Sequence, residues 1–134
     1  MPRRKLFFYA LIVPLLAFVL TGCEPFENAE RLFPLPANVW DRAVPLSDAK
    51  VFEIKLYSEQ EFINLKMLLL TQGYQQQNRD FHFSAKKNGK LFSVKSSDGI
   101  LLIGKQFKDS SLYPAAFYFE RKNTLYLGIG EREK

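Results

Sequence analysis

The sequence predicts an α+β fold, with one helix packed on a meandering antiparallel sheet of about five or six strands in the order β-α-β-β-β-β-β. Two patterns support this prediction. Segment 59–72 repeats apolar residues at helical spacing, whereas most of the chain after residue 74 alternates apolar and polar residues with a period of two. Turn-forming pairs such as Asn88-Gly89 and Asp98-Gly99 divide the alternating part into short strands.

The first strand is predicted over 51–57. Phe52, Ile54 and Leu56 fall on one side of it, and Glu53 and Lys55 fall on the other. This alternation is typical of a strand that buries one face and exposes the other.

The helix is predicted over 59–72. Ser58 with Glu61 three residues later matches the capping-box pattern, and Gly73 readily takes the left-handed conformation that ends a helix. Two rows of residues at helical spacing make the helix apolar enough to be buried against a sheet; they are Phe62, Leu65 and Leu69, and Ile63, Lys66 and Leu70.

The later strands are predicted over 74–85, 90–96, 100–103, 115–121 and 125–129. Segment 100–103 is apolar at every position, which predicts a central place in the sheet. In the other strands every second side chain is expected to face the core: Phe81, Phe83, Phe92, Val94, Phe117, Phe119, Leu125, Leu127 and Ile129.

The start of the chain has the pattern of a signal peptide. Three basic residues at 3–5 precede an uncharged run over 6–20. That run is shorter than the roughly 20 residues of a membrane-spanning helix, and Pro14 in its middle is unfavourable in a stable helix. The order of a basic start, an apolar run and small residues is typical of a cleaved secretory segment.

The residues that close this region, Leu20-Thr21-Gly22-Cys23, resemble the bacterial lipobox. The resemblance covers residues 1–23 and implies cleavage between Gly22 and Cys23. It also implies palmitate-type acyl chains on Cys23, two through a diacylglycerol on the sulfur and in many Gram-negative bacteria a third on the new α-amine. Glu24 in place of Asp favours the outer membrane, facing the periplasm. The alternative is an uncleaved anchor helix with a passive cysteine.

The predicted organisation is a signal peptide over 1–22, a lipidated cysteine with a proline-rich tether over 23–48, and a small α+β domain over 49–134. Cleavage would leave 112 residues, enough for one domain. The mature chain would carry 16 Lys plus Arg against 14 Asp plus Glu, so its charge gives no reason to expect nucleic-acid binding. With Cys23 acylated, no thiol remains for a disulfide or a metal site.

The tether segment contains four prolines and is expected to be largely extended, with a reach of about 75 Å at ~3.1 Å per residue. Its apolar side chains are too many for a free linker, so part of it is expected to lie along the domain. Trp40 has two interpretations: it plugs the edge of the domain, or it anchors a protein partner.

Asp80, His82 and Ser84 alternate on one predicted strand and share the residue types of a catalytic triad. Residues spaced in this way stand about 7 Å apart, whereas a triad needs contacts of about 3 Å. A single histidine without cysteine also lacks the companions of a metal site. We therefore expect neither enzyme activity nor a cofactor.

The sheet face opposite the helix is predicted to carry a partner surface formed by Tyr118, Tyr126, His82, Ser93 and Lys95. Tyrosines among polar residues suit a surface that is wet when free and buried when bound. A mostly solvated sheet face is the alternative. The remaining lysines of the hairpins are expected either to form a basic patch or to be a solvated face that discourages edge-to-edge pairing.

Together these patterns favour a lipid-anchored, non-enzymatic binding or accessory module of the cell envelope, such as an assembly factor or an immunity-type protein. Its partners would be the bacterial membrane, through acylated Cys23, and an envelope protein. A carrier with an apolar cavity between helix and sheet is the main alternative. A hydrolase that uses His82 is the third.

Overall fold

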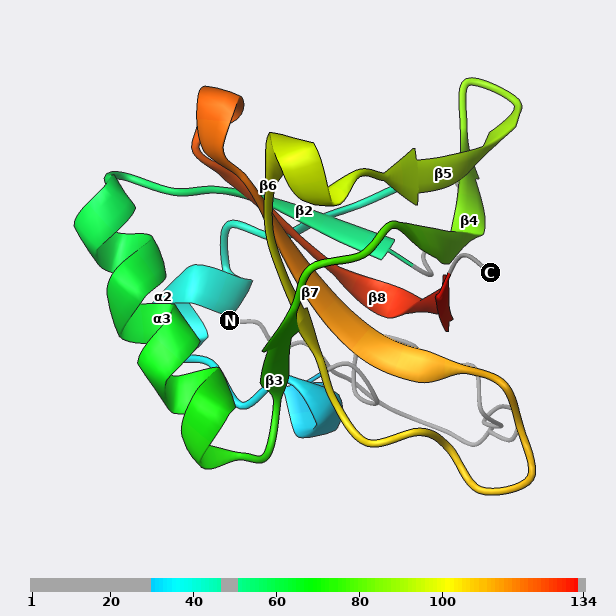
Figure 1. The fold of residues 1–134 in the computed structure, drawn as a ribbon. Coiled ribbons are helices and arrows are strands. Elements are labelled where there is room, and N and C mark those ends of the chain that lie inside the picture. Colours follow the sequence, from blue (N-terminus) through cyan, green and yellow to red (C-terminus); the bar gives the residue numbers. More distant parts are fainter. Residues whose placement is uncertain (1–29, 47–50, 133–134) are drawn as a thin grey trace, which may run out of the picture.

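The computed structural model describes residues 30–46 and 51–132, which form an α+β fold (Figure 1). The predicted class is confirmed. In chain order the elements are α2 (Ala37–Trp40), β1 (Val44–Pro45), β2 (Val51–Lys55), α3 (Glu59–Thr71), β3 (Gln75–Gln77), β4 (Phe81–Lys87), β5 (Lys90–Val94), β6 (Gly99–Ile103), β7 (Tyr113–Phe119) and β8 (Thr124–Arg132). Short 3-10 turns lie at Ser96–Asp98 and Glu120–Lys122.

The strands form one eight-stranded antiparallel sheet, more than the five or six predicted. Its main path runs β1-β2-β8-β7-β6-β3, and β4 pairs with both β8 and β5. The strand predicted over 74–85 is divided in the structure, which raises the count. Its first part pairs with β6 and its second part with β8 and β5, so the chain leaves the ladder between residues 77 and 81.

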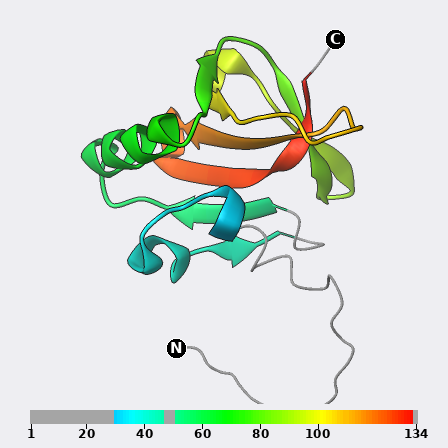
Figure 2. The same cartoon turned by 90° about the horizontal axis from the view of Figure 1, so that it is seen from below.

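Strand β8 is the centre of the sheet. One of its edges pairs along its length with β7, from Tyr113↔Gly130 to Phe119↔Thr124. The other edge pairs first with β2 and then, past Gly128, with β4. β2 and β4 share one edge of β8, so the sheet is strongly curved at this point. In Figure 2 the β4–β5 hairpin projects from the right-hand end of the sheet.

Two hydrophobic clusters fill the two sides of this curled sheet. The first lies under α3, α2 and the N-terminal segment, and its largest members are Phe33, Trp40, Phe52, Phe62, Tyr74, Tyr118, Leu125 and Leu127. The second lies between the sheet and the β4–β5 hairpin, and it contains Val51, Phe81, Phe83, Ala85, Val94, Leu101, Ile103, Ala115, Phe117 and Tyr126. The face predicted to be open is therefore a second core.

The predicted facing of β7 was wrong. Tyr118 pairs with Leu125, and Phe117 pairs with Tyr126. Directly paired residues point to the same side of a sheet, so Tyr118 faces α3 and Phe117 faces the hairpin. The sequence pattern could not decide this, because β7 is apolar on both faces and a shift of one residue reverses every side chain.

The Asn88-Gly89 turn and the caps of α3 are confirmed, whereas the chain turns before Gly99 through a 3-10 turn at Ser96–Asp98 and Gly99 itself is extended. Asn88 and Gly89 both have positive φ, 56° and 80°, as a two-residue hairpin turn requires. Ser58 caps α3 by accepting a hydrogen bond from the Glu61 amide at 3.2 Å. Gly73 follows the helix with φ 98°.

Part of the predicted tether belongs to the domain. Phe33 is 1% exposed and Trp40 5% exposed, both inside the first cluster. Residues 30–43 therefore pack with α3 and the sheet instead of extending away from them. The signal peptide, Gly22, Cys23 and residues 24–29 lie outside the described residues, as do 47–50.

A close backbone approach fixes the point where β8 passes from β2 to β4. A Cβ on Gly130 would lie 2.0 Å from the His82 carbonyl oxygen and 2.7 Å from the Phe83 Cα. Both are main-chain atoms, so neither can rotate away from the added Cβ. Only glycine allows β4 and β8 to pair here.

We predict that Gly130→Ala destabilises the protein by about 1–3 kcal/mol, the typical cost of forcing extra atoms into a packed site. Urea unfolding would measure the change. The control is Glu131→Ala, which alters the neighbouring exposed residue of the same strand and should change stability by less than about 0.5 kcal/mol. Equal stability of the two variants would contradict the close approach.

Candidate functional site

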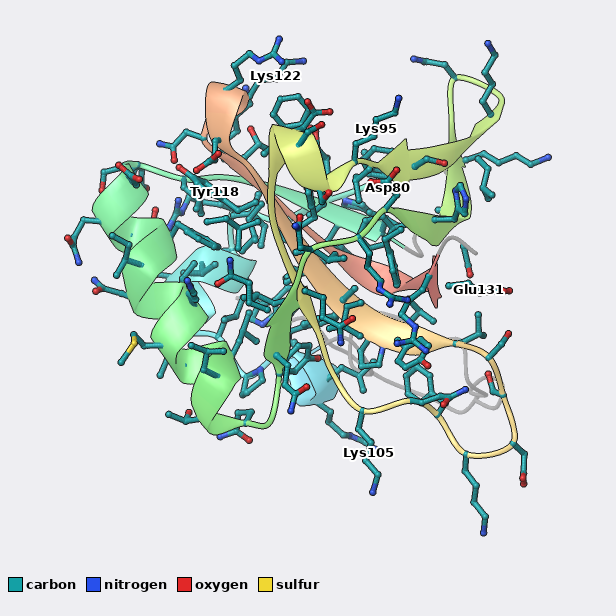
Figure 3. The ribbon with its side chains drawn as sticks, in the orientation of Figure 1. Asp80, Lys95, Lys105, Tyr118, Lys122 and Glu131 are labelled. Atoms are coloured by element: carbon teal, nitrogen blue, oxygen red, sulfur yellow. The ribbon has the colours of Figure 1, made fainter. Side chains whose placement is uncertain are left out.

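A polar row crosses three neighbouring strands on the outer side of the hairpin. Ser93 of β5 pairs with His82 of β4, and His82 pairs with Glu131 of β8. The Nδ1 atom of His82 lies 2.6 Å from the Oγ atom of Ser93, within hydrogen-bond distance. Figure 3 places Glu131 and Lys95 on this part of the molecule. We call His82, Ser93, Lys95 and Glu131 the hairpin face.

A bulge in β4 creates the contact between His82 and Ser93. Near the turn the pairs are Lys87↔Lys90 and Lys86↔Leu91. Continuing that register would place Ser93 opposite Ser84. The ladder shifts between His82 and Lys86, so Ser93 meets His82 instead. The sequence placed His82 and Ser93 on the same predicted face, but it carries no signal for this shift, so their direct contact was not predicted.

Asp80 and His82 have different hydrogen-bond partners in the structure. The Asp80 carboxylate accepts a hydrogen bond from the Ser96 amide at 3.0 Å, where it supports the end of the hairpin. The serine that His82 contacts comes from the neighbouring strand. Ser93 and Glu131 are both exposed, so water competes for every polar group of the row. Polar side chains that pair across neighbouring strands stabilise a sheet, and this explains the arrangement without a catalytic role.

Trp40 lies in the interior. Its indole Nε1 donates a hydrogen bond to the Phe33 carbonyl at 3.1 Å. Its ring meets the Phe52 ring edge to face, with centroids 5.6 Å apart. Of the two interpretations of Trp40, the structure matches the plug, because a side chain that is 5% exposed offers a partner almost no surface.

Tyr118 and Tyr126 lie in opposite clusters, so they do not share a partner surface. The Tyr118 ring stacks on Phe62 of α3 at a centroid distance of 4.0 Å, and its hydroxyl donates to the Asn123 side chain. The Tyr126 hydroxyl donates to the Glu53 carboxylate at 2.9 Å. Burial raises the pKa of Tyr126, and the hydrogen bond and charge of Glu53 raise it further. Burial likewise raises the pKa of Tyr118, aided by the charges of Glu59 and Glu120.

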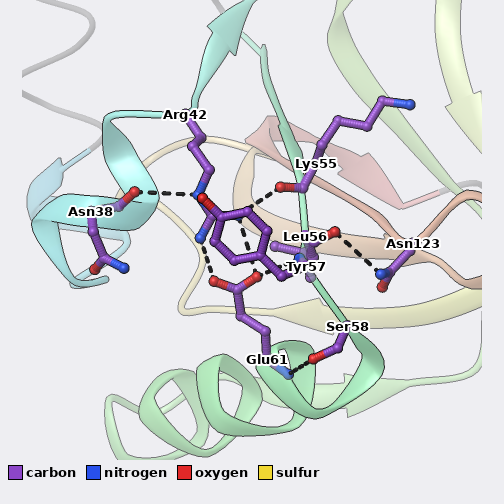
Figure 4. A network of polar contacts seen from close by, with 8 residues as sticks. All are labelled: Asn38, Arg42, Lys55, Leu56, Tyr57, Ser58, Glu61 and Asn123. Atoms are coloured by element: carbon purple, nitrogen blue, oxygen red, sulfur yellow. Dashed lines mark hydrogen bonds and ion pairs between the residues drawn. The ribbon is translucent and has the colours of Figure 1, made fainter.

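An ion pair joins the N-terminal segment to α3 (Figure 4). The Arg42 guanidinium forms a two-pronged pair with the Glu61 carboxylate and donates to the Lys55 carbonyl at 2.7 Å. It also lies over the Tyr57 ring, 3.9 Å from the centroid. The Tyr57 amide donates to Glu61 at 2.7 Å. Glu61 therefore does more than the capping box predicted, because it ties the start of α3 to α2 and β2.

Electrostatics agree with this role. Burial favours the protonated form of Glu61, but the hydrogen bonds from Arg42 and the Tyr57 amide outweigh it, so the pKa of Glu61 is lowered. The hydrogen bond to Glu61 raises the pKa of Arg42. Both groups stay charged at neutral pH, and the pair is a structural clamp.

Helix α3 leaves a row of large apolar side chains uncovered. Its buried face consists of Phe62, Leu65 and Leu69. Ile63, Met67 and Leu70 are 44%, 59% and 38% exposed. They are spaced four and three residues apart and are therefore neighbours on one flank of the helix. We call these three residues the α3 stripe. The second helical row of the sequence was expected to be buried, and here it faces solvent.

No protein-family model, curated protein or solved structure matches this chain. Within residues 30–46 and 51–132, no helix combines the length and apolar character needed to span a membrane. In the same part of the chain no three His, Cys, Asp or Glu side chains are grouped in a way that could hold a metal ion.

We predict that Glu61→Gln lowers the free energy of unfolding by about 1–3 kcal/mol near pH 7, because a partly buried charged hydrogen bond is lost. Since the pKa of Glu61 is lowered on folding, its stabilisation is present above the ordinary Glu pKa of 4.5 and is lost as the pH falls through the folded-state value. The difference between wild type and variant should therefore shrink in acid, as urea unfolding across pH would show.

The matched control is Glu59→Gln, which removes an exposed charge from the same first helical turn. Both substitutions weaken the interaction with the helix dipole, worth about 0.3–1 kcal/mol. Only Glu61→Gln breaks the clamp. Similar losses for the two variants would mean that the helix dipole, and not Arg42, accounts for the stabilisation.

Proposed function

We propose that this protein is a lipid-anchored lipoprotein of the bacterial cell envelope that works as a non-enzymatic binding or accessory module. One observation carries the proposal: a basic start, an apolar run over 6–20 and the tetrapeptide Leu20-Thr21-Gly22-Cys23 follow one another in the order that lipoprotein processing requires. Acylation at Cys23 with two or three chains would give stable attachment, where one chain would not.

The short distance between Cys23 and the packed domain supports a module that works close to its membrane. The described domain starts at Glu30, with six residues between it and Cys23. Seven residue steps span at most about 25 Å. This distance is about a third of the roughly 75 Å predicted for an extended tether that reaches residue 48. A partner would therefore be met near the membrane surface.

The hairpin face supports binding better than catalysis. It combines a histidine, a serine, a lysine and a glutamate on the exposed side of a hairpin whose other side is packed in the second cluster. Such a rigidly backed polar surface suits an envelope protein partner, since side chains held by packing lose little freedom on binding. His82, Ser93 and Lys95 remain from the predicted partner surface, whereas Tyr118 and Tyr126 are buried.

The carrier alternative has less support. The contact between α3 and the sheet is filled by Phe62, Leu65 and Leu69, and Phe62 stacks directly on Tyr118. A ligand between them would have to displace this packing. The hydrolase alternative rests on the contact between His82 and Ser93, for which an exposed polar row is the simpler explanation.

We predict that the wild-type chain incorporates radiolabelled palmitate in a Gram-negative host and that Cys23→Ser does not. Mass spectrometry of the N-terminal peptide should show Cys23 as the first residue with acyl chains attached. A wild-type chain that begins at Met1 or carries no acyl group would overturn the lipoprotein proposal.

We predict that affinity capture from detergent-solubilised envelope recovers a stoichiometric envelope protein with the acylated wild type. A version with Ser at position 23 behind an ordinary cleavable signal should recover it too, because the domain and not the lipid forms the contact. The double variant His82→Ala and Lys95→Ala should lose it. Glu120→Ala, an exposed change away from the hairpin face, serves as the control. Recovery that is unchanged by the double variant would exclude the hairpin face.

A further inference from the structure

The α3 stripe is the feature of the described surface that packing leaves unexplained. Its three members are large and apolar, and they expose from 38% to 59% of their surface. Leu68 is 40% exposed as well, but it follows Met67 by one residue and is therefore turned by about 100° around the helix. It shares the flank of Glu61, seven residues before it, which faces α2. A contiguous exposed apolar row marks an interaction site more often than isolated exposed residues do.

The chain that leads to Cys23 enters the domain at the same end as the stripe. The Tyr74 hydroxyl donates to the Leu32 carbonyl at 2.6 Å, and the Tyr74 ring contacts Phe33. Tyr74 follows the end of α3 by three residues. In Figure 1 the C-terminal end of α3 and the first described residues both lie towards the bottom of the view. Leu70, Met67 and Ile63 lie within about 12 Å of the end of α3 along its axis.

The tether length then restricts how the domain can face the bilayer. Because Glu30 stays within about 25 Å of Cys23, the end of the domain that holds Glu30 must remain near the membrane. Met67 and Leu70 lie in the half of α3 nearest that end, and Ile63 extends the stripe along the helix towards Glu61.

The charges near this end are close to balanced. Lys105 and Lys108 are exposed in the loop after β6, and Figure 3 shows Lys105 at the same end as the C-terminus of α3. Arg31 is exposed beside the first described residues. Against these three cations stand Glu30 and Asp109, and the sequence adds Glu24 and Glu27 between Cys23 and Glu30. Docking on a membrane therefore relies on the α3 stripe and on the short chain to Cys23, and not on charge.

We propose that the α3 stripe docks into the interfacial region of the membrane that holds Cys23, so that the domain lies on the bilayer in one orientation. This inference rests on the proposed lipid anchor. Ile63, Met67 and Leu70 enter the boundary between headgroups and acyl chains, as the apolar faces of interfacial helices do to a depth of about 5–10 Å. Three side chains alone would bind a membrane weakly. The lipid anchor holds them next to the bilayer and so raises their effective concentration there.

The same orientation gives the hairpin face its role. β5 joins β4 on the side of the sheet away from α3, as Figure 1 shows. With the stripe in the membrane, the hairpin face points away from the end that is held by lipid. One surface of the domain would then meet the bilayer and the other would be presented to a protein partner.

A fluorescence measurement on the acylated protein tests the orientation. The mature chain has no thiol other than Cys23, so Met67→Cys supplies a single labelling site for an environment-sensitive dye. Leu68→Cys is the matched control, with similar exposure on the other flank.

In vesicles of phosphatidylethanolamine and phosphatidylglycerol, the label at 67 should shift its emission to the blue, resist quenching by iodide and be quenched by nitroxide lipids. The label at 68 should remain accessible to iodide. Leu70→Glu should abolish the protection at 67, and thermal melting would confirm that this variant is folded.

The outcomes separate the inference from the anchor. If the protein sediments with the vesicles but labels 67 and 68 are equally accessible to iodide, the anchor stands and the docking of the stripe is wrong. If the acylated protein does not sediment with the vesicles, both fail. If label 67 is protected to the same degree in the version with Ser at position 23, without lipid, a second copy covers the stripe and the membrane proposal is overturned.

Discussion

Double burial of β8 is the constraint on which the rest of this structure depends. Leu125 and Leu127 point into one hydrophobic cluster and Tyr126 into the other, each at most 2% exposed. A strand with no solvated face needs cover on both sides, and here α3 with the N-terminal segment covers one side while the β4–β5 hairpin covers the other. The hairpin can reach its place because β4 takes over the edge of β8 where β2 ends, and Gly130 lets the backbones approach there.

The N-terminal segment is part of this construction and also leads to Cys23, the proposed site of the lipid anchor. Trp40 fills the first cluster, and Arg42 ties the segment to the first turn of α3 through Glu61. The Tyr74 hydroxyl likewise holds the Leu32 carbonyl next to the end of α3. A pull or a restraint on the short segment before Glu30 would thus act on a rigid domain. With the proposed lipid anchor, orientation at the membrane would depend on the fold of the domain.

The proposed function divides the described surface into two working regions. The α3 stripe is apolar and lies beside the segment that leads to the lipid, and the hairpin face is polar and lies across the sheet from it. A small accessory lipoprotein needs both attachment and presentation, and a domain of this size can separate them by using opposite sides of one curled sheet. The buried tyrosines keep their hydroxyls bonded to Glu53 and Asn123, so their polar ends stabilise the interior and are not offered to a partner.

The sequence by itself determined the α+β class, the position and caps of α3, the Asn88-Gly89 turn and the first strand, because each depends on spacing and backbone preference within a few residues. Tertiary structure alone decided that the second sheet face is covered, that Tyr118 faces α3 and that a bulge brings Ser93 to His82. It also decided that Ile63 and Leu70 stay exposed although the pattern made them core residues. These outcomes depend on which strand pairs with which edge of β8 and in what register. Register between apolar strands has no local signal, since either face of such a strand can be buried equally well.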